Sequence, residues 1–258
     1  MPTPPAALRG FLSLAWRETW RFLKIWMQTL GAPVVTTLLF LAVFVLALGE
    51  SHRMVEGVPY LEFLGAGLVV MALSQNAFSN ASSSLIIAKL QGNVVDLLMA
   101  PLPPWALLGG LLAGAVLRGL AVALVVLAAM WPLIGFRWAD PGVVLAAGVL
   151  GSALLGLLGI LAGLWAQKFD QVATVTNFVV TPLAFLSGTF FSIERLPEPL
   201  RRVAHADPLF WMMDAFRAGL TGHADGNVAA ELAGLAALVL LLWCVGWWLV
   251  RRGWRLRS

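Results

Sequence analysis

The chain has 258 residues, of which 60% are hydrophobic and only 12% are charged. So few polar side chains cannot cover the surface of a soluble globular domain, and we therefore predict an integral membrane protein. The net charge of +4 does not indicate a nucleic-acid partner, because the basic residues lie mainly at the two ends of the chain.

The first predicted element is an amphipathic helix over residues 8–29. Its polar face carries Arg17, Arg21, Lys24 and Gln28 at helical spacing. Its apolar face carries Trp16, Trp20, Leu23 and Met27. A helix with this pattern is expected to lie along the cytoplasmic interface of a membrane. It either only anchors the first span or also contacts a cytoplasmic partner.

Six apolar runs are each long enough to cross the hydrocarbon core, which takes about 20 residues. They cover residues 30–49, 60–79, 105–131, 142–166, 172–191 and 229–250. Six spans leave both ends of the chain on one side of the membrane, and the basic residues at those ends indicate that this side is the cytoplasm. We therefore expect a single all-α transmembrane domain over 1–258 with both termini in the cytoplasm.

The loop over residues 82–104, between the second and third spans, has a pattern of its own. Residues 85–99 fit a short helix at the cytoplasmic surface, which the prolines at 101, 103 and 104 would end. Two interpretations stay open. The helix either packs on its own bundle or is a lever on which a separate motor protein pushes.

Arg118 lies about halfway along the third span. A charged side chain at that depth costs several kcal/mol unless it is paired or hydrated, which makes it a candidate for a role in a transport pathway. The alternative is a structural arginine. Its long stem would then reach the interface, or its charge would pair with another group such as Asp170 in the fourth loop.

The fifth span carries Pro182 near its middle and Gly188 near its outer end. Because proline has no amide hydrogen for the carbonyl of Phe178, we expect a kink about midway through the bilayer. Gly188 can then end the helix beneath the outer surface, where protein or a wet cavity must satisfy the backbone. The segment 192–221 follows and fits two short amphipathic helices that re-enter the outer leaflet, over 196–205 and 208–220.

Motifs of autonomous catalysis do not occur in the sequence. A phosphate-binding P-loop requires lysine followed by Ser or Thr, but Lys24, Lys89 and Lys168 precede isoleucine, leucine and phenylalanine. The three histidines do not have metalloprotease spacing, and a Gly-x-Ser-x-Gly elbow is absent. A single cysteine, Cys244, excludes an internal disulfide and a thiolate metal cluster. We expect neither an enzyme nor a metal site in this chain.

These segments together resemble the ABC-2 type permease, the membrane subunit of ATP-binding-cassette exporters, and most closely the YadH-like branch of that family. The resemblance covers nearly the whole chain. It is carried by RFLKIWMQTL, SSSLIIAKLQGNVVDLLMAPLPP, GAVLRGLAV, KFDQVATVTNFVVTPLAFLSGTFFSIERLP and HADPLFWMMDAFRAGL. The last two segments in tandem are quite specific.

The resemblance implies a homodimer of six-span permeases in the bacterial inner membrane, joined to two cytoplasmic ATPase subunits. ATP and Mg would bind the ATPases, so no cofactor is expected in this chain. The entry helix and the helix over 85–99 would contact the ATPases, the latter as a coupling helix. The implied coupling residues are Lys89, Leu90, Asp96, Leu97, Arg17 and Arg21.

Substrate would pass between spans one, two and five of the facing subunits. The implied path and gate residues are Arg118, Phe178, Pro182, Gly188, Phe190 and Phe191. Phe190 and Phe191 would close an outer gate, and the alternative for this segment is a packing kink. The few charged groups in the predicted lumenal spans favour a hydrophobic or amphipathic substrate, whether drug, lipid, glycolipid or polysaccharide, over a highly charged one.

Two other classes of protein fit an apolar chain of this kind. An ion-coupled secondary transporter or channel would show several acidic residues at the membrane midplane or broken helices in paired halves. A non-transporting membrane scaffold or sensor would use the same ATPase contact for signalling.

Overall fold

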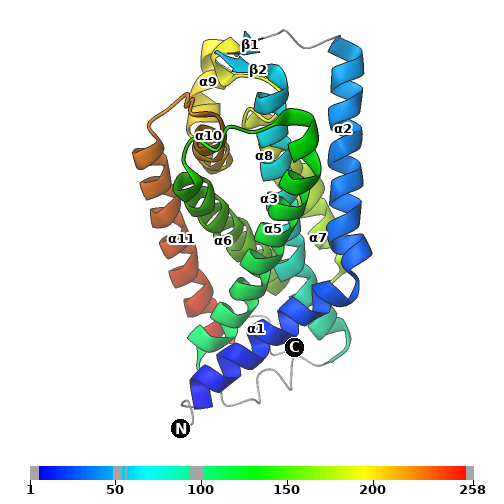
Figure 1. Ribbon diagram of the computed structural model, residues 1–258. Helices are drawn as coiled ribbons and strands as arrows, with labels where there is room; N and C mark the ends of the chain where they lie inside the picture. Colours follow the sequence, from blue (N-terminus) through cyan, green and yellow to red (C-terminus); the bar gives the residue numbers. More distant parts are fainter. Residues whose placement is uncertain (1–5, 49–53, 56, 93–101, 254–258) are drawn as a thin grey trace.

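The computed structural model describes residues 6–48, 54–55, 57–92 and 102–253, which form a bundle of long helices with shorter helices at one end (Figure 1). The first elements are α1 Ala6–Lys24, the π-helical turn η1 Met27–Gly31, α2 Ala32–Leu48, the short strands β1 Met54–Val55 and β2 Val58–Pro59, and α3 Tyr60–Leu90. They are followed by α5 Pro104–Ile134, α6 Pro141–Trp165, α7 Phe169–Val175, the π-helical turn η2 Thr176–Val180 and α8 Thr181–Leu186. The chain continues with the 3-10 turn η3 Ile193–Arg195, α9 Glu198–His205, α10 Pro208–Thr221 and α11 Val228–Arg251.

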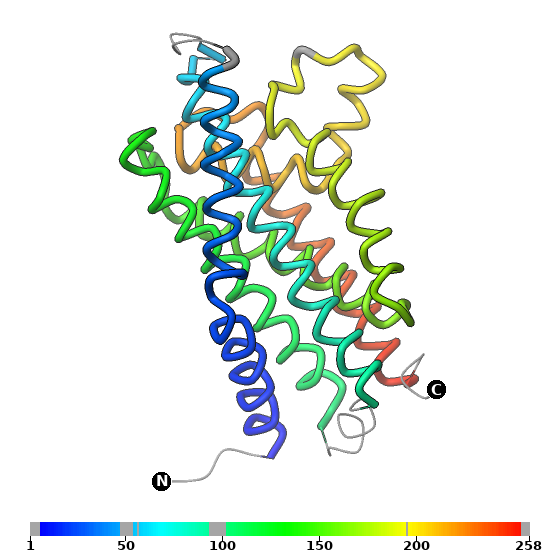
Figure 2. The backbone as a smooth tube through the Cα atoms, turned by 90° about the vertical axis from the view of Figure 1, so that its right-hand side faces the viewer, coloured from blue at the N-terminus to red at the C-terminus, as the bar shows by residue number. Residues whose placement is uncertain are grey.

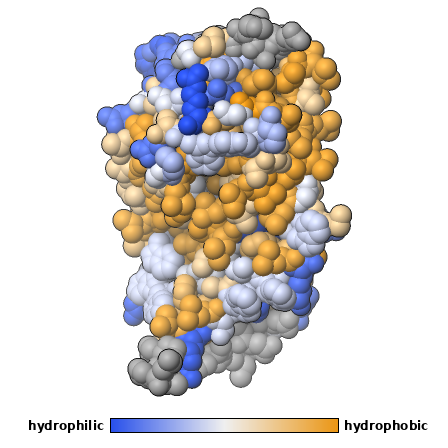
Figure 3. Space-filling model, viewed as in Figure 1, coloured by the Kyte–Doolittle hydropathy of each residue, from blue (hydrophilic) through white to orange (hydrophobic). Residues whose placement is uncertain are grey.

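Six helical segments of the described chain are long and apolar enough to cross a membrane, which confirms the expected number of spans. They cover Met27–Leu46, Tyr60–Leu90, Pro104–Ile134, Pro141–Trp165, Phe169–Leu186 and Val228–Arg251. An apolar band crosses the middle of the face shown in Figure 3, between more polar ends. The start of α1 and the end of α11 lie at the same end of the bundle, as an even number of spans requires (Figure 2).

Local sequence sets the helix ends. The Asp140 carboxylate accepts from the amides of Gly142 at 2.9 Å and Val143 at 3.1 Å, and so caps α6. The Asn227 side chain caps α11 in the same way by accepting from the Ala230 amide at 3.1 Å. At the other end of α5, Gly135 takes a left-handed conformation with φ of 68°, which glycine adopts without steric cost.

The centre of the bundle is α3. Of the residues in its apolar stretch 78% are buried, against 17% for the first and fifth spans and 11% for α11. Glycines on α6 let the two backbones approach closely, because a methyl group at Gly159 would lie 2.5 Å from the Phe78 carbonyl oxygen and one at Gly163 would lie 3.1 Å from that of Ser82. The peripheral spans therefore pack around a tight α3–α6 pair.

The second span is longer than expected, because α3 continues past residue 79 to Leu90. Residues 82–90 are its last turns, so the predicted separate helix over 85–99 is wrong for its first six residues. Two serines in this segment satisfy their hydroxyls within the helix: Ser82 Oγ donates to the Phe78 carbonyl at 2.8 Å and Ser83 Oγ to the Asn80 carbonyl at 3.2 Å. Residues 93–101, including Asp96 and Leu97, lie outside the described residues.

The fifth span consists of α7, η2 and α8 and ends at Leu186, not at residue 191. The Thr181 amide donates to the Thr176 carbonyl across five residues, so the backbone is widened by a π turn directly before Pro182. Gly188 has a φ of 81°, which confirms that the helix ends there. Phe190 and Phe191 consequently follow the helix and are not part of it.

Between the fifth and sixth spans, the structure contains α9 and α10, close to the two helices expected from the sequence. They lie at the end of the bundle opposite α1 (Figure 1). α10 packs against α3, α6 and α11, and most of its residues are buried. It is thus part of the helical core, although its sequence contains the charged residues Asp214 and Arg217.

Candidate transport groove and its connection to α1

A groove opens where α2 leaves the π turn η1 and faces α3. We call it the elbow groove; it has a volume of about 240 Å³. Its lining residues are Gln28, Ala32, Pro33, Thr36, Thr37, Phe40, Leu68, Met71, Ala72, Gln75 and Asn76. Amide groups occur on both walls and hydroxyl groups on the α2 wall, beside aromatic and aliphatic side chains. Such a lining offers hydrogen bonds and apolar contact to one amphipathic molecule.

Arg118 lies behind this groove. Its Nη2 donates to Oδ1 of Asn76 at 2.9 Å, and Nδ2 of Asn76 donates to the Ala72 carbonyl at 2.9 Å. The suggested pairing of Arg118 with Asp170 is wrong, since Asp170 lies exposed in the first turn of α7. Arg118 therefore adjoins the polar wall of the groove through the side chain of Asn76.

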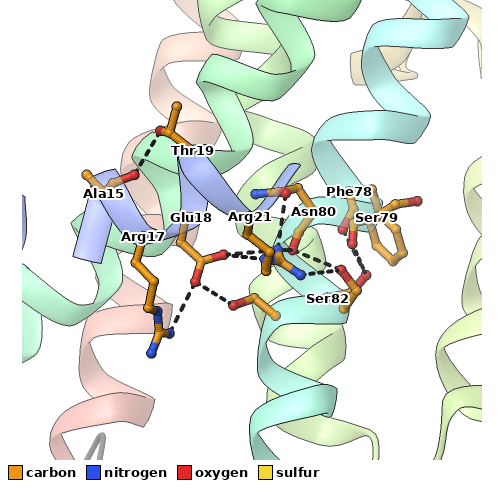
Figure 4. A network of polar contacts seen from close by, with 11 residues as sticks. Ala15, Arg17, Glu18, Thr19, Arg21, Phe78, Ser79, Asn80 and Ser82 are labelled. Atoms are coloured by element: carbon orange, nitrogen blue, oxygen red, sulfur yellow. Dashed lines mark hydrogen bonds and ion pairs between the residues drawn. The ribbon is translucent and has the colours of Figure 1, made fainter. Parts of the chain in front are cut away.

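At the end of the bundle where α1 lies, a buried carboxylate joins α1 to α3. The side chain of Glu18 is 1% exposed and forms an ion pair with Nη2 of Arg21 at 2.9 Å. Ser84 Oγ on α3 donates to Oε1 of Glu18 at 2.8 Å. Arg21 also donates through Nη2 to the carbonyl and the side-chain oxygen of Asn80, at 2.7 and 3.1 Å, and Figure 4 shows these side chains turned toward one another.

Asn76, Asn80 and Ser84 stand four residues apart and therefore share one face of α3. We call this row the α3 polar stripe. Asn80 and Ser84 bind Arg21 and Glu18 of α1. Asn76 binds Arg118 and lines the elbow groove. One rigid helix thus connects the α1 contact with the groove.

The expected coupling residues fall into different environments. Arg21 points inward to α3, whereas the side chain of Arg17 is 55% exposed and pairs with Glu18 at 3.2 Å. Nζ of Lys89 donates to the carbonyls of Leu164 at 2.5 Å and Ala166 at 3.0 Å, at the end of α6. Leu90, the last residue of α3, is 56% exposed.

A second cavity, of about 640 Å³, lies beside α1, and we call it the α1 cavity. Its lining residues are Trp16, Arg17, Glu18, Trp20, Arg21, Lys24, Ile25, Ser84, Ile87, Ala88 and Gln91. It thus brings the basic face of α1 together with the last turns of α3. Two exposed tryptophans, Trp16 and Trp20, stack at its rim with ring centroids 5.9 Å apart.

Of the three phenylalanines expected at the gate, only Phe190 packs into an aromatic stack. The ring of Phe190 stacks on Phe44 of α2 at 5.1 Å and on Phe185 of α8 at 5.0 Å. Phe191 is 36% exposed, and Phe178, on the π turn, is 79% exposed. Phe190 therefore closes the contact between the first and fifth spans, and Phe191 takes no part in that stack.

An ionic cluster at the opposite end of the bundle is buried. Nη2 of Arg217 donates to the Gly188 carbonyl at 2.6 Å, and its guanidinium lies 3.6 Å from the centre of the Phe63 ring. The Asp214 carboxylate accepts from the amides of Asp225 at 2.9 Å and Gly226 at 2.8 Å. The cluster ties α10 to the turn after the fifth span and to the loop before α11.

Asp207 caps α10 beside this cluster. Its Oδ1 accepts from the Leu209 amide at 2.9 Å and its Oδ2 from the Ser187 hydroxyl at 2.9 Å. Burial raises the pKa of the Asp207 carboxyl, although both hydrogen bonds act in the opposite direction.

Sequence reasoning identified Arg118 and Arg21 but missed most of their partners. Glu18 could have been noticed as a carboxylate placed between two arginines. The four-residue spacing of Asn76, Asn80 and Ser84 was a second signal of a shared helix face. The Arg217 cluster was marked only by charges within an otherwise apolar helix.

Comparison with known proteins gives consistent matches. The sequence model of the family described as "ABC-2 type transporter" matches residues 9–221. The chain is 34% identical over 245 residues to the inner membrane transport permease YadH of Escherichia coli (strain K12), with 94% of each chain covered. It is 27% identical over 259 residues to nodulation protein J of Neorhizobium galegae, with 93% of this chain and 94% of the relative covered.

Proposed function

Because this chain belongs to the ABC-2 type transporter family, we propose that it is the permease subunit of an ATP-driven exporter whose energy comes from a separate ATPase. As a member of that family with six apolar helices, the chain is a transport permease that passes the inner membrane several times. We further propose that two copies assemble with two ATPase subunits and that both termini face the cytoplasm.

The observation that carries this proposal is the α3 polar stripe. It connects the α1 cavity, at one end of the bundle, with the elbow groove, which lies between the first and second spans. A permease without an ATP site of its own needs such a mechanical connection between its partner and its substrate. The α1 cavity supplies a basic and aromatic surface for the ATPase contact.

In the proposed cycle, closure of the ATPases pushes on α1 and on the end of α3. Arg21 and Glu18 transmit this push to Asn80 and Ser84, because charge-assisted hydrogen bonds hold the two helices together. The movement of α3 relative to α2 then changes the shape of the elbow groove. At the other end, separation of Phe190 from Phe44 opens the way out between the first and fifth spans.

The proposal is tested with the purified permease and its ATPase in sealed vesicles. We expect movement of a fluorescent amphiphile only when ATP is hydrolysed, and no movement with an ATPase variant that binds but does not hydrolyse ATP. Movement driven by an ion gradient without ATP would replace the proposal with an ion-coupled transporter. ATP turnover without movement of any amphiphile tested would favour a scaffold or sensor.

The role of the stripe is tested with Glu18→Gln, which keeps the size of the side chain but removes its charge. We expect ATP turnover to continue while transport per ATP falls. Thr19→Ala is the matched control, since the Thr19 hydroxyl donates within α1 to the Ala15 carbonyl. Equal loss of transport in both variants would contradict a specific role for Glu18.

A further inference from the structure

The charge of Arg118 is not balanced by a carboxylate among the described residues. Its one hydrogen bond there goes to a neutral amide oxygen, that of Asn76, and its buried Nε has no hydrogen-bond partner. Glu18, the carboxylate bound to the α3 polar stripe, already pairs with two other arginines, at 3.2 and 2.9 Å. The bundle around the stripe thus carries a surplus of positive charge.

This surplus adjoins the elbow groove. Asn76 lines the groove and at the same time accepts from Arg118, so a single side chain stands between the guanidinium and the groove. Gln28, Thr36 and Gln75 offer further hydrogen bonds around the same position. In a partly dry site, an anion is a stronger acceptor for guanidinium than an amide oxygen is.

The rest of the groove is apolar. Phe40, Leu68 and Met71 line it beside the amides, and α2 continues away from it as an exposed aliphatic helix. The volume of about 240 Å³ suits a headgroup with the first part of a chain and not a large polar molecule. A tail that leaves the groove would follow the lipid-facing side of α2.

We propose that the elbow groove binds an amphiphile with a single anionic headgroup, a carboxylate, phosphate or sulfate, and that Arg118 determines this preference. The inference rests on the proposed function, because it names the substrate class of the same transporter. Arg118 supplies the charge and Asn76 positions it. The apolar wall selects an acyl or alkyl chain over a free inorganic anion.

Binding is measured on the permease–ATPase complex in nanodiscs of zwitterionic lipid, by calorimetric titration corrected with empty nanodiscs. The probes are dodecyl phosphate, the neutral dodecyl maltoside and inorganic phosphate. We expect dodecyl phosphate to bind about tenfold more tightly than dodecyl maltoside, which corresponds to about 1.4 kcal/mol. Inorganic phosphate at the same concentrations is expected to give no measurable heat.

Two variants remove the charge in different ways. Arg118→Gln deletes it, and Asn76→Asp neutralises it with a side chain of the same shape, so the second variant answers the question even where the first does not fold. Both are expected to lose the preference for dodecyl phosphate and to keep the affinity for dodecyl maltoside. Arg118→Lys is expected to keep the preference. Arg202→Gln, which removes an exposed charge on α9, is the control and is expected to behave as the wild type.

Equal affinity of the wild type for the two amphiphiles would overturn the inference, as would an unchanged preference in Asn76→Asp. Binding of inorganic phosphate alone would also overturn it, because the site would then recognise a small anion. Each of these results leaves the proposed function standing if ATP still drives the transport of a neutral amphiphile. Failure of all ATP-driven transport, with the binding preference intact, would instead reject the proposed function alone.

Discussion

The two ends of the bundle each contain arginines and carboxylates, but they bury them differently. In the ionic cluster at the end opposite α1, the side chains of Arg217 and Asp225 are 1% and 2% exposed. At the α1 end, Glu18 is equally buried, yet its partners Arg21 and Arg17 are 30% and 55% exposed and line a cavity of about 640 Å³. A closed ionic cluster holds elements in one arrangement, whereas a half-open one permits its partners to move.

We therefore expect the buried cluster around Arg217 to contribute mainly to stability and the half-open network around Glu18 mainly to transport. Removal of one partner from a fully buried cluster leaves a charge without compensation and costs folding energy. Removal of a partner from the half-open network leaves a charge that water in the cavity can solvate, so the loss is expected mainly in transport.

The largest effect is expected for Arg217→Ala. The change removes the guanidinium that lies 3.9 Å from Asp225 and donates to the Gly188 carbonyl, and a broken buried pair costs about 3–5 kcal/mol. We expect a strongly lowered melting temperature and little permease in the membrane. Arg202→Ala, at a side chain that is 78% exposed, is the control and is expected to change stability by less than about 0.5 kcal/mol. Equal melting temperatures of the two variants would erase the distinction between the ends.

Glu18→Ala is expected to impair transport more than stability, the opposite of Arg217→Ala. It removes one charge-assisted hydrogen bond from Ser84 on α3 and one from Arg21 within α1, each worth about 1.5–3 kcal/mol, but Arg21 can turn into the cavity and remain hydrated. We expect about tenfold slower transport at similar ATP turnover, with a smaller drop in melting temperature than for Arg217→Ala. A larger drop would place Glu18 in the same structural class as Arg217.

The two phenylalanines after the fifth span should differ as well. Phe190→Ala removes two stacked contacts, each worth about 0.5–1.5 kcal/mol, whereas Phe191→Ala removes none of them. We expect Phe190→Ala to raise ATP turnover in the absence of substrate and to lower transport per ATP, because the outer contact no longer closes. Measured in the same vesicles, Phe191→Ala is expected to stay close to the wild type.

Asp207→Asn is expected to give the smallest effect. Because the pKa of Asp207 is raised in the folded chain, its stabilising contribution is complete below the ordinary carboxyl value of 3.8 and declines as pH rises through the folded pKa. Asparagine caps helices about as well but does not titrate. The melting temperature of the wild type should therefore fall more between pH 4 and pH 7 than that of the variant. Parallel pH profiles would contradict the role assigned to burial.

Much of the fold was predictable, because each span is set by a local property of the sequence. Apolar length identified five of the six spans within about three residues at their ends on the α1 side of the bundle. Proline and glycine located the interruption and the end of the fifth span. The second span was cut short at residue 79 because Ser82 and Ser84 lower the local hydropathy. Their hydroxyls are satisfied inside protein, which a scale based on transfer into lipid does not anticipate.

The candidate site was less accessible to sequence reasoning. Arg118 was noticeable alone, since charge at the middle of a span is rare. Its partner Asn76 is 42 residues away and was not predicted, because the pairing depends on how α5 packs against α3. The same holds for Arg21 and Asn80, which are 59 residues apart. Charges can be located from sequence, but what compensates them is a property of the tertiary structure.

The glycine contact between α3 and α6 has a consequence for how this protein moves. Since backbone meets backbone at Gly159 and Gly163, neither helix can slide without atomic overlap. The pair is therefore expected to behave as a fixed frame, with the slowest amide hydrogen exchange in the chain. If structures of the inward-open and outward-open states are superposed on α3 and α6 alone, the displacement should appear in α2 and the fifth span. The absence of a side chain at Gly159 and Gly163 is therefore what provides the fixed part of the bundle against which the other helices move.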